Sequence, residues 1–75
     1  MKILTVFEEV TGTVVAVEEN HVIFENIGPV AIDDNRVLEK VKGNVAKKIS
    51  VLRTNIPGKE YLMRCIWQQK EKGIL

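Results

Sequence analysis

Basic side chains in the second half of the chain could do chemistry by binding the phosphates of a nucleic acid. Lys and Arg contacts to phosphate supply most of the affinity of proteins that bind nucleic acids without sequence preference. Proteins that bind single strands also need exposed aromatic rings, on which the bases stack. The candidate nucleic-acid-binding residues are therefore Lys47, Lys48, Arg53, Asn55, Lys59 and Arg64, with Phe24 and Tyr61 as candidate stacking rings.

The charges of the chain divide between its two halves. Residues 1–35 carry one base and seven acids, a net charge of −6, whereas residues 36–75 carry ten bases and three acids, a net charge of +7. One interpretation is a basic face for phosphates. The other is that acidic and basic strands neutralise each other within one sheet, where a facing pair of opposite charges contributes about 0.2–1 kcal/mol. The sequence leaves both open.

The sequence contains no arrangement typical of a catalytic site. His21 and Cys65 are the only histidine and cysteine, and nothing in their spacing brings them together. The Cys65 thiol follows an apolar alternation, so we expect it to be a small buried hydrophobe. Adjacent acids such as Glu8 and Glu9 point to opposite faces of a strand and do not converge on a substrate. We therefore expect a protein that is not an enzyme and has no catalytic residue.

Metal-ligating and cofactor-binding patterns are equally sparse. Charged residues cluster around one expected hairpin, at Glu18, Glu19, His21 and Glu25, but their spacing is unlike that of zinc or calcium sites. The five glycines are isolated from one another, so no phosphate-binding loop is present in the sequence. We expect solvated loop charges here, with no metal and no cofactor.

Length and composition predict one small, mostly β domain. Seventy-five residues can enclose a single core. The lone cysteine rules out a disulfide within the chain and favours a reducing compartment. Eleven Val and eight Ile against five Leu favour strands, because β-branched side chains suit a pleated surface. The aliphatic runs are far too short to span a membrane, so we expect a soluble, cytoplasmic protein.

Five extended segments are predicted to position the candidate residues, at 3–17, 21–25, 29–33, 47–54 and 60–68. The first segment is long for one strand, and we expect it to bend at Gly12, because a glycine inside a strand marks a bulge or sharp bend. The last segment favours a strand with Arg64 facing outward. Its apolar positions also fit a helix over 60–72, and the sequence leaves that alternative open.

A short helix and a tight turn complete the predicted elements. Val37, Leu38 and Val41 share one helical face, Asp34 or Asn35 can cap the start of the helix, and Gly43 ends it. Pro57 followed by Gly58 predicts a type II turn before the last strand, because the third position of that turn requires positive φ.

This order of elements matches the layout of a five-stranded Greek-key barrel of the OB type, with an SH3-like or Sm-like small barrel as the alternative. We expect residues 1–75 to form this single domain, with residues 69–75 as a frayed end. The leading hypothesis is a non-catalytic binding module that acts through protein–protein contacts or self-association, with residues 70–75 as a docking tail. The second is an OB-type protein that binds single-stranded RNA or DNA through a basic face within residues 47–64.

Overall fold

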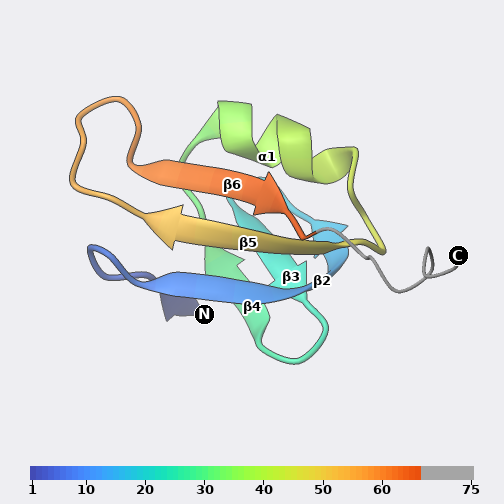
Figure 1. The fold of residues 1–75 in the computed structure, drawn as a ribbon. Helices are drawn as coiled ribbons and strands as arrows, with labels where there is room; N and C mark the ends of the chain where they lie inside the picture. The colour runs from blue at the N-terminus through green and yellow to red at the C-terminus, as the bar shows by residue number, and fades with distance from the viewer. Residues whose placement is uncertain (67–75) are drawn as a thin grey trace, which may run out of the picture.

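The structure, a computed structural model, describes residues 1–66 of the chain. These residues form six strands and one helix, in the order β1 (Lys2–Ile3), β2 (Glu9–Val17), β3 (His21–Phe24), β4 (Gly28–Ala31), α1 (Asn35–Lys42), β5 (Lys48–Arg53) and β6 (Tyr61–Cys65) (Figure 1). The strands make one mixed sheet in the spatial order β1-β4-β3-β2-β5-β6, in which β1 and β4 run parallel. The predicted mostly β domain with one short helix is confirmed.

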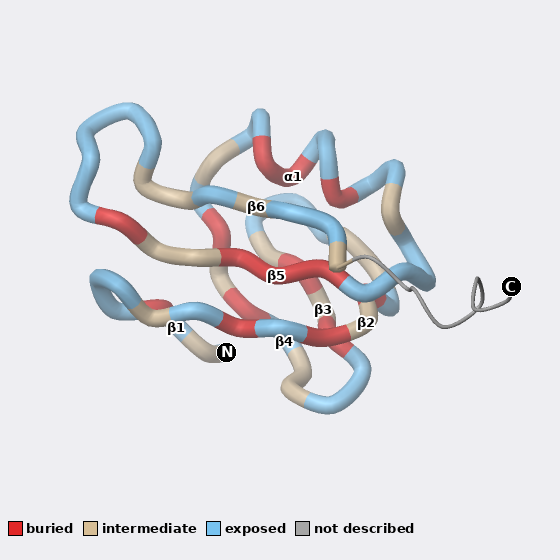
Figure 2. The backbone as a smooth tube through the Cα atoms, viewed as in Figure 1, coloured by how far each residue is buried: buried red, intermediate tan, exposed pale blue. Residues whose placement is uncertain are grey.

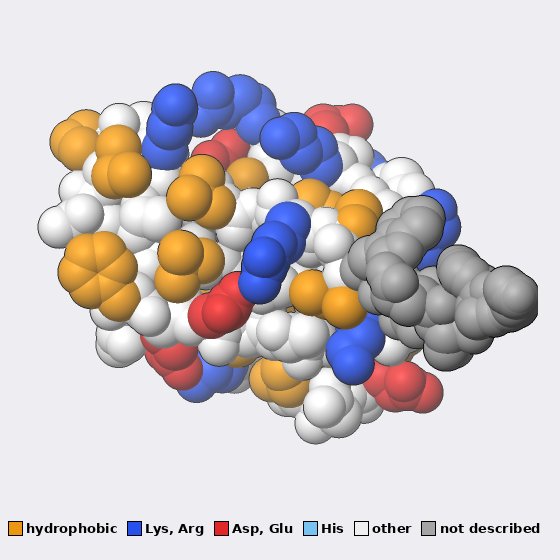
Figure 3. Space-filling view, in the orientation of Figure 1, with side chains coloured by type: hydrophobic (Ala, Val, Ile, Leu, Met, Phe, Trp, Pro, Cys, Tyr) orange, Lys and Arg blue, Asp and Glu red, His pale blue; other side chains and the backbone are white. Residues whose placement is uncertain are grey.

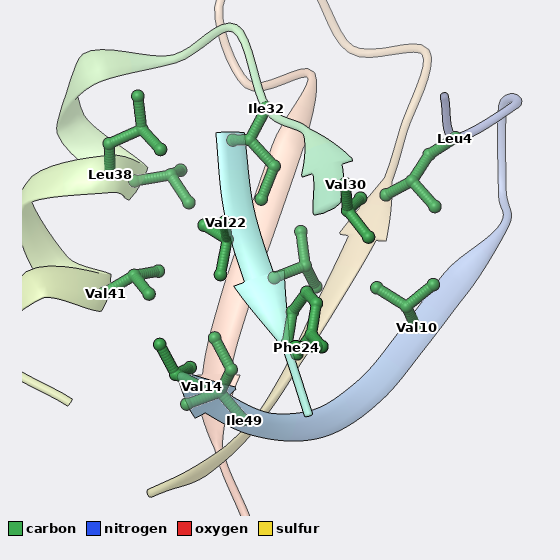
Figure 4. Packing of buried hydrophobic residues seen from close by; sticks show 12 residues of the cluster. Leu4, Val10, Val14, Val22, Phe24, Val30, Ile32, Leu38, Val41 and Ile49 are labelled. Carbon is green, nitrogen blue, oxygen red and sulfur yellow. The ribbon is translucent and has the colours of Figure 1, made fainter. Parts of the chain in front are cut away.

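β2 is the strand that joins the two halves of the sheet. Its residues 9–13 pair antiparallel with β5, and its residues 14–17 pair antiparallel with β3. The register with β3 shifts between Val14 and Ala16, as at a β-bulge, and β2 curves strongly around the core (Figure 4). The irregularity therefore lies after Val14, and the expected bend at Gly12 is not where the register shifts.

Gly12 has a different role from the one expected of it. A Cβ atom at this position would lie 3.0 Å from Asn26 Oδ1 and 3.2 Å from Phe24 Cδ1. Glycine suits this position because the side chains of Phe24 and Asn26 approach the β2 backbone closely.

The predicted first segment, 3–17, is wrong as a single strand. A tight turn at residues 5–8 separates β1 from β2. The Glu8 N–H donates to the Thr5 carbonyl at 2.9 Å, and the Glu8 carboxylate accepts the Thr5 N–H at 3.0 Å. The apolar pair Val6 and Phe7 imitates a strand in the sequence, but both side chains are exposed in the turn.

α1 confirms the predicted helix. The Asp34 carboxylate accepts the N–H groups of Arg36 at 3.0 Å and of Val37 at 3.4 Å, which caps the first turn. The apolar face, Val37, Leu38 and Val41, is buried. Eight residues are too few to persist as an isolated helix, so this packing is what stabilises α1.

The core lies between the inner side of the curved sheet and α1 (Figures 2 and 4). Side chains from β2, β3, β4 and β5 point toward one another and toward the helix. The buried apolar residues are Leu4, Val10, Val14, Val22, Phe24, Val30, Ile32, Val37, Leu38, Val41, Ile49 and Val51. Branched aliphatic side chains dominate this set, in agreement with the composition.

The turn and the last strand also follow the sequence. Gly58 has φ +82°, and the Lys59 N–H donates to the Ile56 carbonyl at 3.0 Å, as the predicted type II turn requires. β6 is a strand over its five residues, so the helical alternative is wrong for Tyr61–Cys65. Glu60 and Ile66, at the two ends of the predicted segment, lie outside the strand. Residues 67–68 of that segment, the predicted frayed end at 69–75 and the predicted docking tail at 70–75 lie outside the described residues.

Closure of the sheet into a barrel is not confirmed. Within residues 1–66, β1 pairs with β4 alone and β6 pairs with β5 alone, so these two strands form the edges of an open sheet. α1 packs against β2, β3 and β6, next to the position where closure would occur. What is shown is a mixed six-stranded sheet with one helix on its inner side.

Candidate functional site

One side of the β2, β5 and β6 strands turns away from the core. Val10 and Val51 point into the core, and because side chains alternate along a strand, their neighbours point outward. The strand register places these neighbours in two rows, with Glu9 beside Leu52 and Leu62 in one, and Thr11 beside Ser50 and Arg64 in the other. We call these six residues the outer face.

A hydrogen-bond network lies at the centre of the outer face. The Ser50 hydroxyl donates to the Glu9 carboxylate, and the Thr11 hydroxyl donates to Ser50 Oγ at 3.2 Å. Ser50 is only 1% exposed although it points away from the core. Fixing a carboxylate in this way reduces the conformational freedom that Glu9 would lose on binding.

The outer face is hollowed beside this network. A shallow depression of about 390 Å³ is lined by Glu9, Ser50, Leu52, Leu62, Met63 and Arg64. Its rim therefore carries one acid and one base, and the two leucines lie between them. Such a surface can bind an apolar group that has charges on either side.

Apolar side chains extend the outer face toward the 5–8 turn. Phe7 is 66% exposed and Leu62 is 44% exposed, and Leu52, which pairs with Leu62, is half-buried. Figure 3 shows hydrophobic side chains gathered at this end of the molecule, where the 5–8 turn and the 54–60 loop flank the sheet. We call Phe7, Leu52 and Leu62 the apolar patch.

The backbone holds Phe7 in an uncommon conformation. Its φ is +69°, a value that bulky residues rarely adopt and that costs of order 1 kcal/mol. The Phe7 N–H donates to the Arg53 carbonyl at 2.6 Å, and the Arg53 N–H donates to the Glu8 carbonyl at 2.9 Å. Phe7 and Glu8 therefore both lie opposite Arg53, as in a β-bulge. These bonds fix the exposed ring beside the end of β5.

Sequence reasoning missed Phe7 because it placed the residue inside a strand. The signal that could have found it is the spacing of Thr5 and Glu8. A glutamate three residues after a threonine can reach back to the threonine N–H, as in a capping box, and that contact closes the 5–8 turn. Val6 and Phe7 are then the two residues at the tip.

Of the two expected stacking rings, one is buried and the other is half-buried. Phe24 is 1% exposed and belongs to the core, so its place in the predicted nucleic-acid site is wrong. Tyr61 is half-buried and packs against the core, and the Arg53 guanidinium lies 5.3 Å from the centre of its ring. That cation–π contact already occupies one face of the Tyr61 ring.

The predicted cations are spread along the sheet. Lys48 begins β5 and Arg53 ends it, about 17 Å away for a six-residue strand, and Lys47 directly precedes β5. Lys59 and Asn55 are exposed in the 54–60 loop, and Arg64 belongs to the outer face. The structure therefore brings together Arg53, Asn55 and Lys59 at one end, and leaves Lys47 and Lys48 at the other.

Arg36, which the sequence did not single out, joins the first of these groups. Its Nη2 atom donates to the Gly58 carbonyl at 2.6 Å and ties the start of α1 to the 54–60 loop. Within the loop, the Thr54 hydroxyl donates to the Lys59 carbonyl at 2.6 Å and accepts the Ile56 N–H at 3.1 Å. The loop is thus held by its own hydrogen bonds as well as by the helix.

The charge division of the sequence does not produce ion pairs between facing strands. Among residues 1–66 the ion pairs are Lys2–Glu8 at 2.7 Å, Asp34–Arg36 at 3.8 Å and Glu39–Lys42 at 3.0 Å. Each joins residues at most six positions apart. The interpretation in which acidic and basic strands neutralise each other is therefore wrong for this part of the chain.

The Cys65 thiol is exposed, so the expectation that it is buried is wrong. Its Sγ atom donates to Asn44 Oδ1 at 3.2 Å, because the end of β6 lies beside the turn after α1. Residues 1–66 contain no cluster of three acidic, histidine or cysteine side chains that could hold a metal ion. No helix in the same range has the length and hydropathy needed to cross a membrane.

One carboxyl group has a shifted pKa. The hydrogen bond from Lys2, and then that from the Thr5 N–H, hold the pKa of Glu8 below its usual value, because both favour the charged form. Glu8 closes the 5–8 turn, so its ionisation is coupled to the conformation that presents Phe7.

No protein-family model, no curated protein and no solved structure matches this chain. The outer face and the apolar patch are therefore the features from which a function can be inferred.

Proposed function

We propose that this protein is a non-catalytic binding module that acts through protein–protein contacts made by the outer face and the apolar patch. The observation that carries the proposal is the exposure of Phe7 and Leu62 next to Leu52, on a face whose rim has a fixed carboxylate and a guanidinium. Apolar patches bordered by polar groups are typical of protein interfaces.

The energetics favour a protein partner for this patch. Burying a side chain such as Phe or Leu contributes about 1.5–3 kcal/mol relative to leaving it exposed. Holding Phe7 at positive φ costs free energy in the isolated domain. Because the hydrogen bonds of the turn already hold the Phe7 ring in one position, little conformational entropy would be lost when a partner binds it.

The proposed architecture is an open form of the OB layout. The neighbours β4-β3-β2-β5-β6, with α1 between β4 and β5 in the chain, follow the order of that fold, and β1 is an additional edge strand. In this layout the outer face is the outward side of β2, β5 and β6, opposite the side on which α1 packs.

Site-specific photo-crosslinking in cells tests the proposal. A photoreactive phenylalanine analogue at Leu62 is expected to give covalent protein adducts. The matched control is the same analogue at Val15, which is 53% exposed but lies outside the apolar patch. Absence of adducts from Leu62, or equal adducts from both positions, would contradict the proposal.

A second candidate function is binding of single-stranded RNA or DNA, and one observation favours it. Phe7 supplies a more exposed ring than Phe24 or Tyr61, beside the cation Arg53. Titration with short oligonucleotides at low salt would then shift the amides of the 5–8 turn and the 54–60 loop, and Phe7→Ala would weaken binding, because a stacked base contributes about 1–3 kcal/mol.

A further inference from the structure

We propose that the partner of the outer face is a second copy of this chain, related by a two-fold axis that brings Glu9 of each copy to Arg64 of the other. This inference rests on the proposed function and names the partner of that face. It depends on the arrangement of six residues fixed by the strand register.

The register places the two charges at diagonal corners of the outer face. Glu9 begins the row that continues with Leu52 and Leu62, and Arg64 ends the row that begins with Thr11 and Ser50. From the spacing of strands and of residues along them, the Cα atoms of Glu9 and Arg64 are about 12 Å apart. One acid and one base leave the face with no net charge, so two copies do not repel each other.

A two-fold axis that lies between the two copies, parallel to the sheet and perpendicular to this diagonal, makes the face complementary to itself. It exchanges the two corners, so that each Glu9 meets an Arg64, as an isologous interface requires. On a nearly flat face the same rotation lays Leu52 of one copy over Leu62 of the other.

Both charges are available for such contacts. Within residues 1–66, neither Glu9 nor Arg64 takes part in an ion pair. The Ser50 hydroxyl already fixes the Glu9 carboxylate, so little side-chain entropy remains to be lost on binding. A charge pair at each end of the diagonal, with four leucines between the pairs, therefore gives a contact that combines apolar and charged groups.

The test is a charge exchange followed by sedimentation velocity. The purified 75-residue chain, from about 1 µM to about 1 mM, is expected to form a dimer that weakens as salt screens the pairs. The variants E9R and R64E each place like charges together twice, and each is expected to weaken dimerisation about tenfold or more. An equimolar mixture of the two, and the double variant E9R/R64E, restore both pairs and are expected to dimerise again.

Two further variants separate this effect from damage to the fold. Glu9→Gln keeps an acceptor for Ser50 and removes the charge, so a smaller loss of dimer is expected with an unchanged amide spectrum. Glu19→Arg changes an exposed acid in the loop before β3 and is expected to leave the dimer unchanged.

A wild-type chain that stays monomeric at the highest concentration would overturn the inference, as would folded single variants whose mixture fails to dimerise. If Leu62 then crosslinks to a different protein in cells, the proposed function stands and the second copy is the wrong partner. If the chain dimerises but the charge exchange has no effect, another surface forms the dimer and the inference also fails.

Discussion

Phe7, Gly12 and Ser50 show how single residues shape this domain through what surrounds them. Phe7 is exposed because the hydrogen bonds of its turn hold it at positive φ. Ser50 is buried on an outward face because its hydroxyl joins Glu9 to Thr11. The Cα atom of Gly12 carries only hydrogen atoms, and a methyl group at the same place would contact the ring of Phe24. None of these properties follows from residue type alone.

Replacement of Gly12 by alanine is expected to destabilise the domain by about 1–3 kcal/mol. The new Cβ would lie 3.2 Å from Phe24 Cδ1, and a ring inside a packed core has little room to move. Urea unfolding followed by circular dichroism measures the change. Gly43→Ala is the control, because the nearest atom, the Lys40 carbonyl oxygen, lies at 3.7 Å, and it should change stability by no more than about 0.5 kcal/mol.

The short elements depend on side chains that satisfy their exposed backbone groups. α1 begins at a carboxylate that accepts two N–H groups, and the 5–8 turn closes on a carboxylate that accepts one. Because both elements are short, their packing and these few bonds decide whether they form. Each therefore has a single residue at which it can be tested.

Removing the cap of α1 is expected to lower stability by about 1 kcal/mol. Asp34→Ala deletes the acceptor for the N–H groups of Arg36 and Val37. Asp34→Asn keeps a side-chain oxygen at the same place and should lose much less. Equal losses for the two variants in urea unfolding would show that the carboxylate acts through its charge.

The 5–8 turn is expected to loosen in acid. Because the pKa of Glu8 is lower in the folded chain than in the unfolded chain, its carboxylate stabilises the fold above the unfolded pKa, and this contribution is lost as the pH falls through the folded pKa. An NMR titration should show the Phe7 amide moving with the Glu8 carboxyl. In the Lys2→Ala variant the midpoint should rise, and an unchanged midpoint would mean that Lys2 does not hold the turn.

At the scale of the whole molecule, local patterns predicted the elements well and the site poorly. The cap and apolar face of α1, the Pro57–Gly58 turn and the alternation in β3 are each encoded within a few residues. The outer face depends on the register of three strands that are distant in the sequence. The alternation in the sequence shows that Phe24 and Val22 lie on the same face of β3. Whether that face is buried in the core or lines a groove depends on how strands distant in the sequence pack against it.

β6 forms an open edge of the sheet, and the hydrogen bonds at its two ends show which of its amide groups are bonded to β5. The Thr54 N–H donates to the Glu60 carbonyl at 2.7 Å, and the Ile66 N–H donates to the Lys48 carbonyl at 2.9 Å. Since bonded and non-bonded pairs alternate between antiparallel strands, the N–H groups of Leu62 and Arg64 point to β5. Those of Tyr61, Met63 and Cys65 point away from it.

Amide hydrogen exchange should therefore alternate along β6. The amides of Leu62 and Arg64 are expected to exchange slowly, at rates near those of β5, which has neighbours on both sides. The amides of Tyr61, Met63 and Cys65 should exchange faster. Protection of all five would mean that the sheet closes through β6 as a barrel, or that β6 pairs with another chain at this edge. Dilution separates these outcomes, because protection within one chain does not depend on concentration, whereas protection by a partner does.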